Sequence, residues 1–154
     1  MATVYTLKGI GAALSYNASG LPVVKGELDV PECILNPALL ALAASPKAKL
    51  TSFAGFANGD SVKIAKIPKG FLAQHAIVQH KKGEATVTIN IGDADSGTLY
   101  SSGIAVASAT DSILCAQSGG AKIYNAEGYL LITFGAASAE LCAFSVSLFG
   151  MLAE

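Results

Sequence analysis

Apolar and polar residues alternate along much of the chain from Val62 onward, which is the pattern of β-strands with one buried face. The clearest stretch is Glu84–Gly92, where Val87, Ile89 and Ile91 alternate with Thr86, Thr88 and Asn90. The C-terminal stretch Leu141–Phe149 repeats the pattern, with Cys142, Phe144, Val146 and Leu148 set against Ala143, Ser145 and Ser147. Both stretches predict strands whose apolar sets face the core.

Short turns between such stretches predict two hairpins. Phe71–His80 precedes Glu84–Gly92, and Lys81–Lys82–Gly83 offers a tight connection with a glycine. Farther along, Ala121–Tyr124 and Tyr129–Phe134 flank a second turn. Strands separated by short turns, without long helical patterns between them, predict an all-β fold: an antiparallel β-sandwich or barrel.

The first 35 residues have a different character. Six glycines and prolines interrupt them, with only weak alternation: Gly9, Gly11, Gly20, Pro22, Gly26 and Pro31. They predict an irregular N-terminal arm with one edge strand around Leu21–Val30, packed either on its own domain or against a neighbouring copy. The chain therefore divides into this arm, residues 1–49, and a β-sandwich domain, residues 50–154.

One short helix is predicted over residues 37–45. Asn36 supplies an N-cap, Pro37 suits the first helical position, and Ser45–Pro46 ends the pattern. Because Ala38–Leu42 is apolar on every face, we expect it to have a buried structural role.

The composition narrows the classes of function. The 154 residues include no Arg and no Trp, 52% are hydrophobic and only 14% are charged, with a net charge of −1. A chain without Arg or a basic run does not suit nucleic-acid binding. No apolar run approaches the roughly 20 residues that cross a bilayer, and the N-terminus does not resemble a signal peptide. We therefore expect a soluble chain whose apolar surface is covered by copies of itself.

Candidate chemical residues are few. Three cysteines, Cys33, Cys115 and Cys142, show no zinc or disulfide spacing and are interpreted as small buried hydrophobic residues of a reducing compartment. Cys115 as a thiol nucleophile lacks a partner fixed by the sequence. His75 and His80 lie five residues apart on one predicted strand, so they face opposite ways and do not suit a shared metal site. No residue is assigned as catalytic, cofactor-binding or metal-binding.

The segment Asp93-x-Asp95-x-Gly97 resembles the start of a calcium loop, but its glycine comes one place early and no Glu follows at the twelfth position. The interpretation we prefer is a solvated turn with Asx-type hydrogen bonds. Gly9-Ile-Gly11 and Ser118-Gly119-Gly120 lack the context of nucleotide loops and are interpreted as ordinary loops. The six phenylalanines are expected in the core.

Part of the chain resembles a known family. Ile67-Pro68-Lys69-Gly70-Phe71-Leu72, the strand ending in Thr88-Ile89-Asn90-Ile91-Gly92-Asp93, and the C-terminal strands Gly128–Gly135 and Ala143–Leu148 are similar to head proteins of tailed bacteriophages. Over about residues 60–149 the succession of strand and turn motifs resembles that of small jelly-roll decoration (cement) proteins. That resemblance implies a jelly-roll sandwich and a homotrimer on the outer surface of the phage head, bound to the major capsid protein and reinforcing junctions between capsomers.

Two function classes follow. The first is a non-enzymatic virion structural protein of this cement type, without a cofactor, whose arm could grip the shell or a neighbouring subunit. The alternative is a head-fibre, adhesin or carbohydrate-binding jelly-roll module that uses the Asp93–Gly97 loop and tyrosines, with or without calcium. A small-molecule enzyme of the cupin kind is disfavoured because two opposed histidines cannot converge on one metal.

Overall fold

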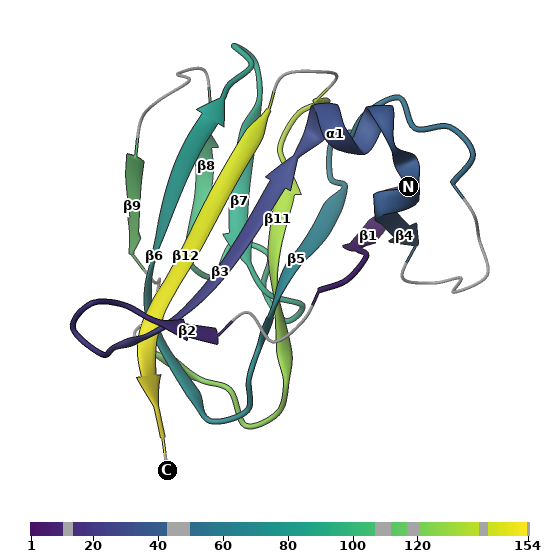
Figure 1. Cartoon of the computed structure of the whole chain (residues 1–154). Helices are drawn as coiled ribbons and strands as arrows, with labels where there is room; N and C mark the ends of the chain where they lie inside the picture. The colour runs from purple at the N-terminus through teal and green to yellow at the C-terminus, as the bar shows by residue number, and fades with distance from the viewer. Residues whose placement is uncertain (11–13, 43–49, 107–111, 117–120, 139–141, 154) are drawn as a thin grey trace.

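The protein is described by a computed structural model covering residues 1–10, 14–42, 50–106, 112–116, 121–138 and 142–153, with side chains described outside residues 112–116. Two β-sheets pack face to face (Figure 1). In the first sheet the strands follow the order β4 (Leu40–Leu42), β1 (Val4–Leu7), β5 (Ser61–Ile67), β11 (Gly128–Phe134), β7 (Thr88–Gly92) and β8 (Ser101–Ala105). In the second sheet the order is β10 (Lys122–Ile123), β6 (Phe71–Lys82), β12 (Ala143–Leu152), β3 (Pro22–Asp29) and β2 (Leu14–Tyr16), while β9 (Ser112–Ala116) also pairs with β6.

The predicted all-β sandwich is confirmed. Among the described strands, every pair is antiparallel except β1 with β5, which is parallel. The alternating sets also face inward as predicted: the apolar side chains of residues 87–91 and 142–148 that the pattern assigned to the core are all buried. The inward faces of both sheets share one apolar core, to which every second residue of these strands contributes a side chain.

Neither predicted hairpin forms. β6 belongs to the second sheet, whereas β7 pairs with β11 and β8 in the first. Likewise, β10 pairs with β6 in the second sheet, whereas β11 pairs with β5 and β7 in the first sheet. Alternation determines which face of a strand is buried, but it does not determine which strand lies beside it. The short turns therefore carry the chain from one sheet to the other.

The one α-helix among the described residues lies before the predicted position. It is α1 (Val30–Leu35), where the Asp29 carboxylate accepts a hydrogen bond from the Glu32 N–H at 3.2 Å. At the predicted site Pro37–Leu39 forms only a single 3₁₀ turn, and the chain then extends into β4, which pairs with β1. Within Ala38–Leu42 only Leu40 is buried, and Ala38 is exposed. Residues 43–49 lie outside the described part. No helix in the described ranges has the length and apolar character to cross a bilayer.

The N-terminal residues are more regular than the predicted arm. β1 pairs with β5 in the first sheet, and β3 pairs with β12 along seven residues of the second. The expected strand around Leu21–Val30 is therefore present, but it is not an edge strand, because β2 pairs with its outer side. Long-range pairing supplies the order that the weak local pattern did not indicate. The boundary at residues 49 and 50 stays a prediction.

Candidate functional site

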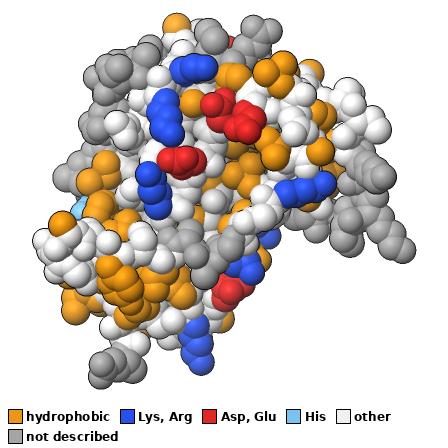
Figure 2. All heavy atoms as spheres, in the orientation of Figure 1, with side chains coloured by type: hydrophobic (Ala, Val, Ile, Leu, Met, Phe, Trp, Pro, Cys, Tyr) orange, Lys and Arg blue, Asp and Glu red, His pale blue; other side chains and the backbone are white. Residues whose placement is uncertain are grey.

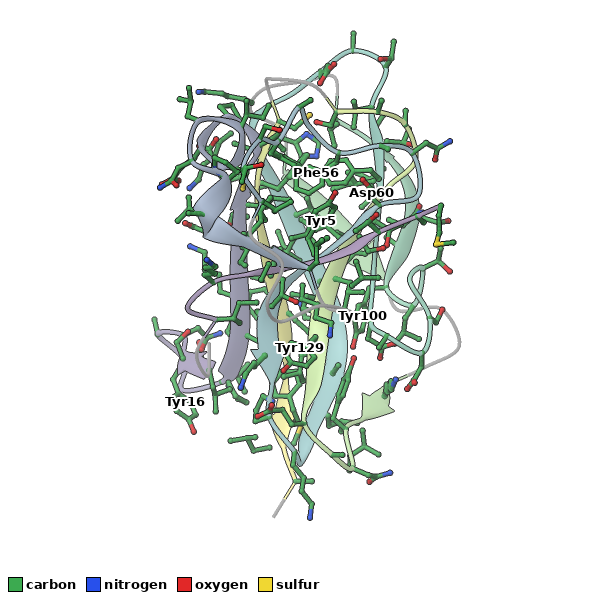
Figure 3. The ribbon with its side chains drawn as sticks, turned by 90° about the vertical axis from the view of Figure 1, so that its right-hand side faces the viewer. Tyr5, Tyr16, Phe56, Asp60, Tyr100 and Tyr129 are labelled. Atoms are coloured by element: carbon green, nitrogen blue, oxygen red, sulfur yellow. The ribbon has the colours of Figure 1, made fainter. Side chains whose placement is uncertain are left out.

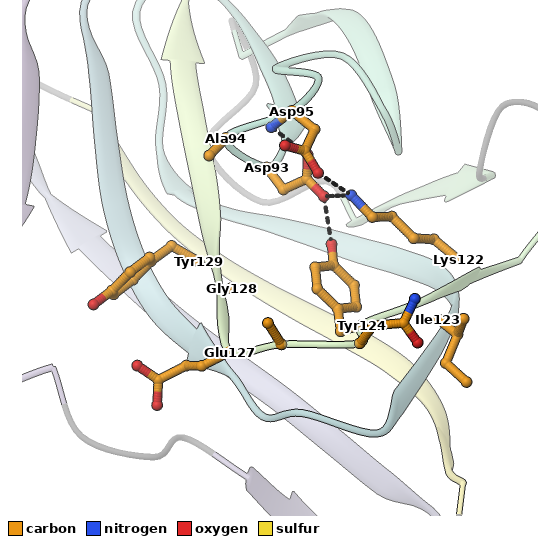
Figure 4. Close-up of a pocket in the computed structure, with 11 residues that line it drawn as sticks. Asp93, Ala94, Asp95, Lys122, Ile123, Tyr124, Glu127, Gly128 and Tyr129 are labelled. Carbon is orange, nitrogen blue, oxygen red and sulfur yellow. Dashed lines mark hydrogen bonds and ion pairs between the residues drawn. The ribbon is translucent and has the colours of Figure 1, made fainter.

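A polar cluster joins the two sheets where the loop after β7 meets β10 (Figure 4). We call it the Asp93 clasp; it consists of Asp93, Asp95, Tyr100, Lys122 and Tyr124. The Asp93 carboxylate is buried, accepts a hydrogen bond from the Tyr124 hydroxyl at 2.8 Å, and forms an ion pair with the Lys122 ammonium. Lys122 also contacts Asp95 at 3.0 Å, and the Tyr100 and Tyr124 hydroxyls hydrogen-bond to each other. The clasp thus connects the first sheet to the edge of the second.

Local backbone structure explains why Asp93 is held there. Its other carboxylate oxygen accepts the backbone N–H groups of Asp95 at 3.0 Å and Ser96 at 2.9 Å, which is an Asx turn. The loop folds back closely over Gly92, where a Cβ would lie 2.1 Å from the Ser96 carbonyl oxygen, so glycine is required at that position. The predicted Asx turn is confirmed, but Asp93 is buried and not solvated.

A lysine, and not a metal ion, lies between the two carboxylates of the calcium-like segment. The Lys122 ammonium lies between the Asp93 and Asp95 carboxylates, where a cation bound by both would have to sit (Figure 4). Within the described residues no group of three or more His, Cys, Asp or Glu side chains is placed to hold a metal ion. The two carboxylates therefore share one positive charge, which the chain itself supplies.

Contacts within the clasp shift the pKa values of Asp93, Lys122 and Tyr124. Burial alone would raise the pKa of Asp93, but the hydrogen bonds from Lys122, Ser96 and Tyr124 outweigh it, and the pKa lies below its usual value. Burial disfavours the charged form of Lys122, yet its two carboxylate partners raise the pKa above the usual range. Burial raises the pKa of Tyr124, and the neighbouring Tyr100 and Asp93 raise it further. Tyr124 therefore remains a protonated hydrogen-bond donor.

A cleft of about 430 Å³ runs beside the clasp, along residues 122–129. Two residues that line it have partners within the chain: Glu127 pairs with Lys66 at 3.4 Å, and the Lys63 ammonium lies 4.5 Å from the centre of the Tyr129 ring. Because the buried charges neutralise one another, the arrangement suits a structural connection between the sheets. The carbohydrate-binding alternative for this loop and its tyrosines stays a prediction.

The structure separates the two histidines as expected. His80 is buried, with its ring edge-on to Phe144 in the core. His75 is half-buried on the outer face of the second sheet, stacked on Phe149 with ring centres 5.0 Å apart. They lie on opposite faces of β6, as the spacing predicted.

Sequence reasoning missed three members of the clasp. The loop at Asp93 was singled out, but Tyr100, Lys122 and Tyr124 were not, since Lys122 follows Asp93 by 29 residues and Tyr124 by 31. The sequence signal was weak: of only ten lysines, one lies two residues before a tyrosine in the short stretch Ala121–Tyr124.

Cys33 and Cys142 are buried and free, as predicted, while the side chain of Cys115 lies outside the described part. Burial and the nearby Asp29 and Glu32 raise the pKa of the Cys33 thiol to about 11. We therefore expect a Cys115→Ser variant to remain unlabelled by a maleimide at pH 7.5 while folded, because a buried thiol reacts slowly. Mass spectrometry checks this, with the same variant in denaturant as the control that must take two labels. Rapid labelling of the folded variant would contradict the burial.

Comparisons with known proteins place this fold. No protein-family model matches the sequence, and no curated protein sequence matches it. A chain in the capsid asymmetric unit of cyanophage Pam1 superposes with a TM-score of 0.58 at 16% identity, covering 93% of this chain and 89% of that one. A chain in the capsid of Ralstonia phage GP4 superposes with a TM-score of 0.61 at 9% identity, covering 98% and 99%. The chain shares its fold with chains of two phage capsid structures.

Proposed function

We propose that this chain is a non-enzymatic structural protein of a phage virion, a decoration (cement) protein that binds the outer surface of the head as a homotrimer. One observation carries the proposal: the fold matches a chain of the Ralstonia phage GP4 capsid over 98% of this chain and 99% of that one. The likeness covers the whole length, so it includes both sheets and the N-terminal strands.

The chemistry of the site agrees with a structural role. In the described part of the chain, the buried polar cluster neutralises itself across the two sheets, and no metal-binding group is present. An enzyme needs groups whose charge or hydrogen-bonding capacity is left for a substrate. The clasp instead connects the two sheets, which suits a protein that must keep its shape as part of a shell.

Reinforcement follows from symmetry and number. Three linked copies at a junction can each make a modest contact with the shell, and linked contacts together bind far more tightly than one alone. A bound trimer then holds neighbouring capsomers together, so the shell can separate only if several contacts break at once. The major capsid protein would be its partner.

Binding to head shells tests the proposal. Purified protein is mixed with shells of the encoding phage prepared without it, and the pellet is analysed after sedimentation. We expect uptake that saturates at a fixed ratio to the major capsid protein, and shells that release their DNA at a higher temperature once decorated.

Shells that already carry their full complement are the control and should take up none. No sedimentation with bare shells, or uptake that never saturates, would refute the decoration role. Cryo-electron microscopy of the decorated shells would show whether the protein lies outside.

A further inference from the structure

The sequence contains one Asn-Gly pair, Asn58–Gly59, which lies in the turn just before β5. An asparagine followed by glycine is especially prone to spontaneous deamidation, because glycine has no side chain to hinder attack by its backbone nitrogen on the asparagine amide. The Asn58 side chain is exposed, so water reaches it. The pair is therefore a candidate modification site, and the contacts of the turn determine when it can react.

The reaction needs only the chain and water. The Gly59 backbone nitrogen loses its proton and bonds to the side-chain carbonyl carbon of Asn58, while the bond from that carbon to the amide nitrogen breaks and ammonia leaves. Water then opens the five-membered imide at either of its carbonyl groups. The product has an aspartate or an isoaspartate at position 58, so an amide becomes a carboxylate, and the isoaspartate also adds one methylene to the backbone.

The folded turn keeps the two reacting groups apart. The Asp60 N–H donates a hydrogen bond to the Ala57 carbonyl oxygen at 3.1 Å, which closes a four-residue turn. Gly59 has a φ of +86° whereas the φ of Asn58 is not positive, which is the type II pattern. A type II turn fixes the peptide plane between its two central residues, so the Gly59 nitrogen can reach the Asn58 side chain only if that plane rotates. Ring closure therefore needs the turn to open.

The Gly59 nitrogen is also held by the first sheet. Its N–H donates to the Phe134 carbonyl oxygen of β11 at 2.7 Å, and the Phe134 N–H donates to the Asp60 carbonyl oxygen at 2.9 Å. A backbone N–H in such a hydrogen bond has to be released by a local opening before it can lose its proton. The fold therefore blocks the first chemical step as well as the ring closure.

The N-terminal segment holds the same turn from another side. The buried Asp60 carboxylate accepts hydrogen bonds from the Thr3 N–H at 2.8 Å and from the Ala57 N–H at 2.9 Å. The Ser61 N–H donates to the Thr3 carbonyl oxygen at 2.9 Å. Because Thr3 leads directly into β1, the turn keeps its shape only while β1 is in place beside β5.

We propose that Asn58 is a deamidation site controlled by the N-terminal strand: the folded turn protects the amide, and the amide is lost when β1 leaves the first sheet and the turn opens. An isoaspartate then lengthens the backbone between Ala57 and Asp60, so the hydrogen bonds to Phe134 and Thr3 no longer form together. The reaction is irreversible, so a chain that stays open for long loses the native attachment of β1. This inference is independent of the decoration role.

Mass spectrometry after incubation at pH 7.5, in buffer and in urea, tests the protection. Cleavage after lysine gives peptide 50–63, where Asn58 is the one side-chain amide, and peptide 123–154, where Asn125 is the one. We expect position 58 to gain about 1 Da at least about tenfold more slowly in buffer than in urea, because the rate follows the population of the opened state. Asn125 is also exposed but precedes Ala126, whose methyl group hinders attack, so it should react slowly in both.

Charge gives a second readout. Few charged side chains lie on the face of the molecule that Figure 2 shows, and the chain has a net charge of −1. One added carboxylate changes this net charge from −1 to −2. Anion-exchange chromatography therefore separates deamidated chains from intact ones.

Thr3→Pro, with Thr3→Ala as its matched control, tests the part played by β1. Both variants lose the hydroxyl, but only proline also removes the N–H that the Asp60 carboxylate accepts. In buffer we expect position 58 to react at least about tenfold faster in the proline variant, with circular dichroism showing that both variants are folded. Equal rates in the two folded variants would overturn the inference. If the proline variant does not fold, the wild type decides, and equal rates in buffer and urea would overturn the inference.

Refolding tests the consequence. Wild type deamidated in urea is purified by anion exchange, refolded and compared with Asn58→Asp, which has the same charge on a normal backbone. We expect the deamidated chain to unfold at a temperature at least about 3 °C lower. Equal unfolding temperatures would show that the added methylene leaves the attachment of β1 intact, and would overturn the irreversible loss.

Discussion

Replacing Asp93 with alanine is expected to lower the free energy of unfolding by about 3 kcal/mol, the low end of the range for breaking a buried ion pair. The substitution leaves the Lys122 ammonium, only 25% exposed, without its buried partner, and it removes the acceptor of the Tyr124 hydroxyl. It also releases two backbone N–H groups of the loop. Urea denaturation at a fixed protein concentration measures the loss, because association makes the stability of an oligomer depend on concentration.

Asp95→Ala is the matched control. Asp95 contacts the same ammonium at 3.0 Å, but its side chain is 85% exposed, so we expect its loss to cost less than about 1 kcal/mol. Equal losses for the two variants would show that burial of the Asp93 carboxylate does not set the strength of the clasp.

The cost of Asp93→Ala should depend on pH. The pKa of Asp93 is lowered in the folded protein, so its carboxylate stabilises the fold above the unfolded value of about 3.9, and this contribution is lost as pH falls through the folded pKa. The pKa of Lys122 is raised, so its contribution is present below about pH 10 and is lost as pH rises through the folded value. Wild type and variant should therefore differ most between these limits and converge in acid.

The clasp also holds the edge strand β10 in place. Lys122 and Tyr124 point inward to Asp93, so Ile123 between them faces outward beside Leu72. β10 is only two residues long and lies at a sheet edge. The buried ion pair therefore fixes an edge strand that its own two backbone pairings would hold weakly.

The sequence pattern predicted the strands and their buried faces, but it did not predict which strands lie side by side in each sheet. Alternation at Val87, Ile89 and Ile91 predicted a buried set correctly, since side chains change face at every residue. The same rule carries no information on which strand pairs with β7, so the predicted hairpin partner was wrong. Pairing is decided by how both sheets fill one core, which involves residues far apart in the chain.

The misplaced helix has a local cause. Asn36–Pro37 offers a cap and a proline, but Asp29, Pro31 and Glu32 offer the same features with an acidic residue in the first turn. Both segments begin a helical turn, and only α1 continues, because the residues after Leu39 pair with β1 as a strand. The candidate site shows the same division. The Asp93 turn was predictable from local residues, whereas its partner Lys122 was not, because tertiary structure brings Lys122 next to Asp93.

Replacing Phe56 with alanine is expected to lower the free energy of unfolding by about 4 kcal/mol, the usual cost of truncating a buried phenylalanine. Phe56 is 2% exposed and belongs to no strand, yet its ring stacks on Phe134 of β11 with centres 4.6 Å apart and meets Tyr5 of β1 edge-on at 5.4 Å (Figure 3). Phe134 in turn contacts Phe144 of β12. The ring therefore packs between the N-terminal strand and β11, and through Phe134 it is linked to the second sheet, so its loss leaves a cavity that none of these elements can fill alone.

Phe53→Ala is the control, because Phe53 contacts the same two rings, Tyr5 and Phe56, but is only half-buried. It should cost about 2 kcal/mol, in proportion to the smaller area removed from water. Urea denaturation of both variants decides the point, with the urea dependence of each unfolding transition showing whether the native state stays compact. If Phe56→Ala cost no more than Phe53→Ala, the aromatic cluster would be a surface cover and not the link between the N-terminal strand and the sandwich. If the loss is as large as expected, β1 is held as firmly as the sheets, and residues first interpreted as an arm are part of the core.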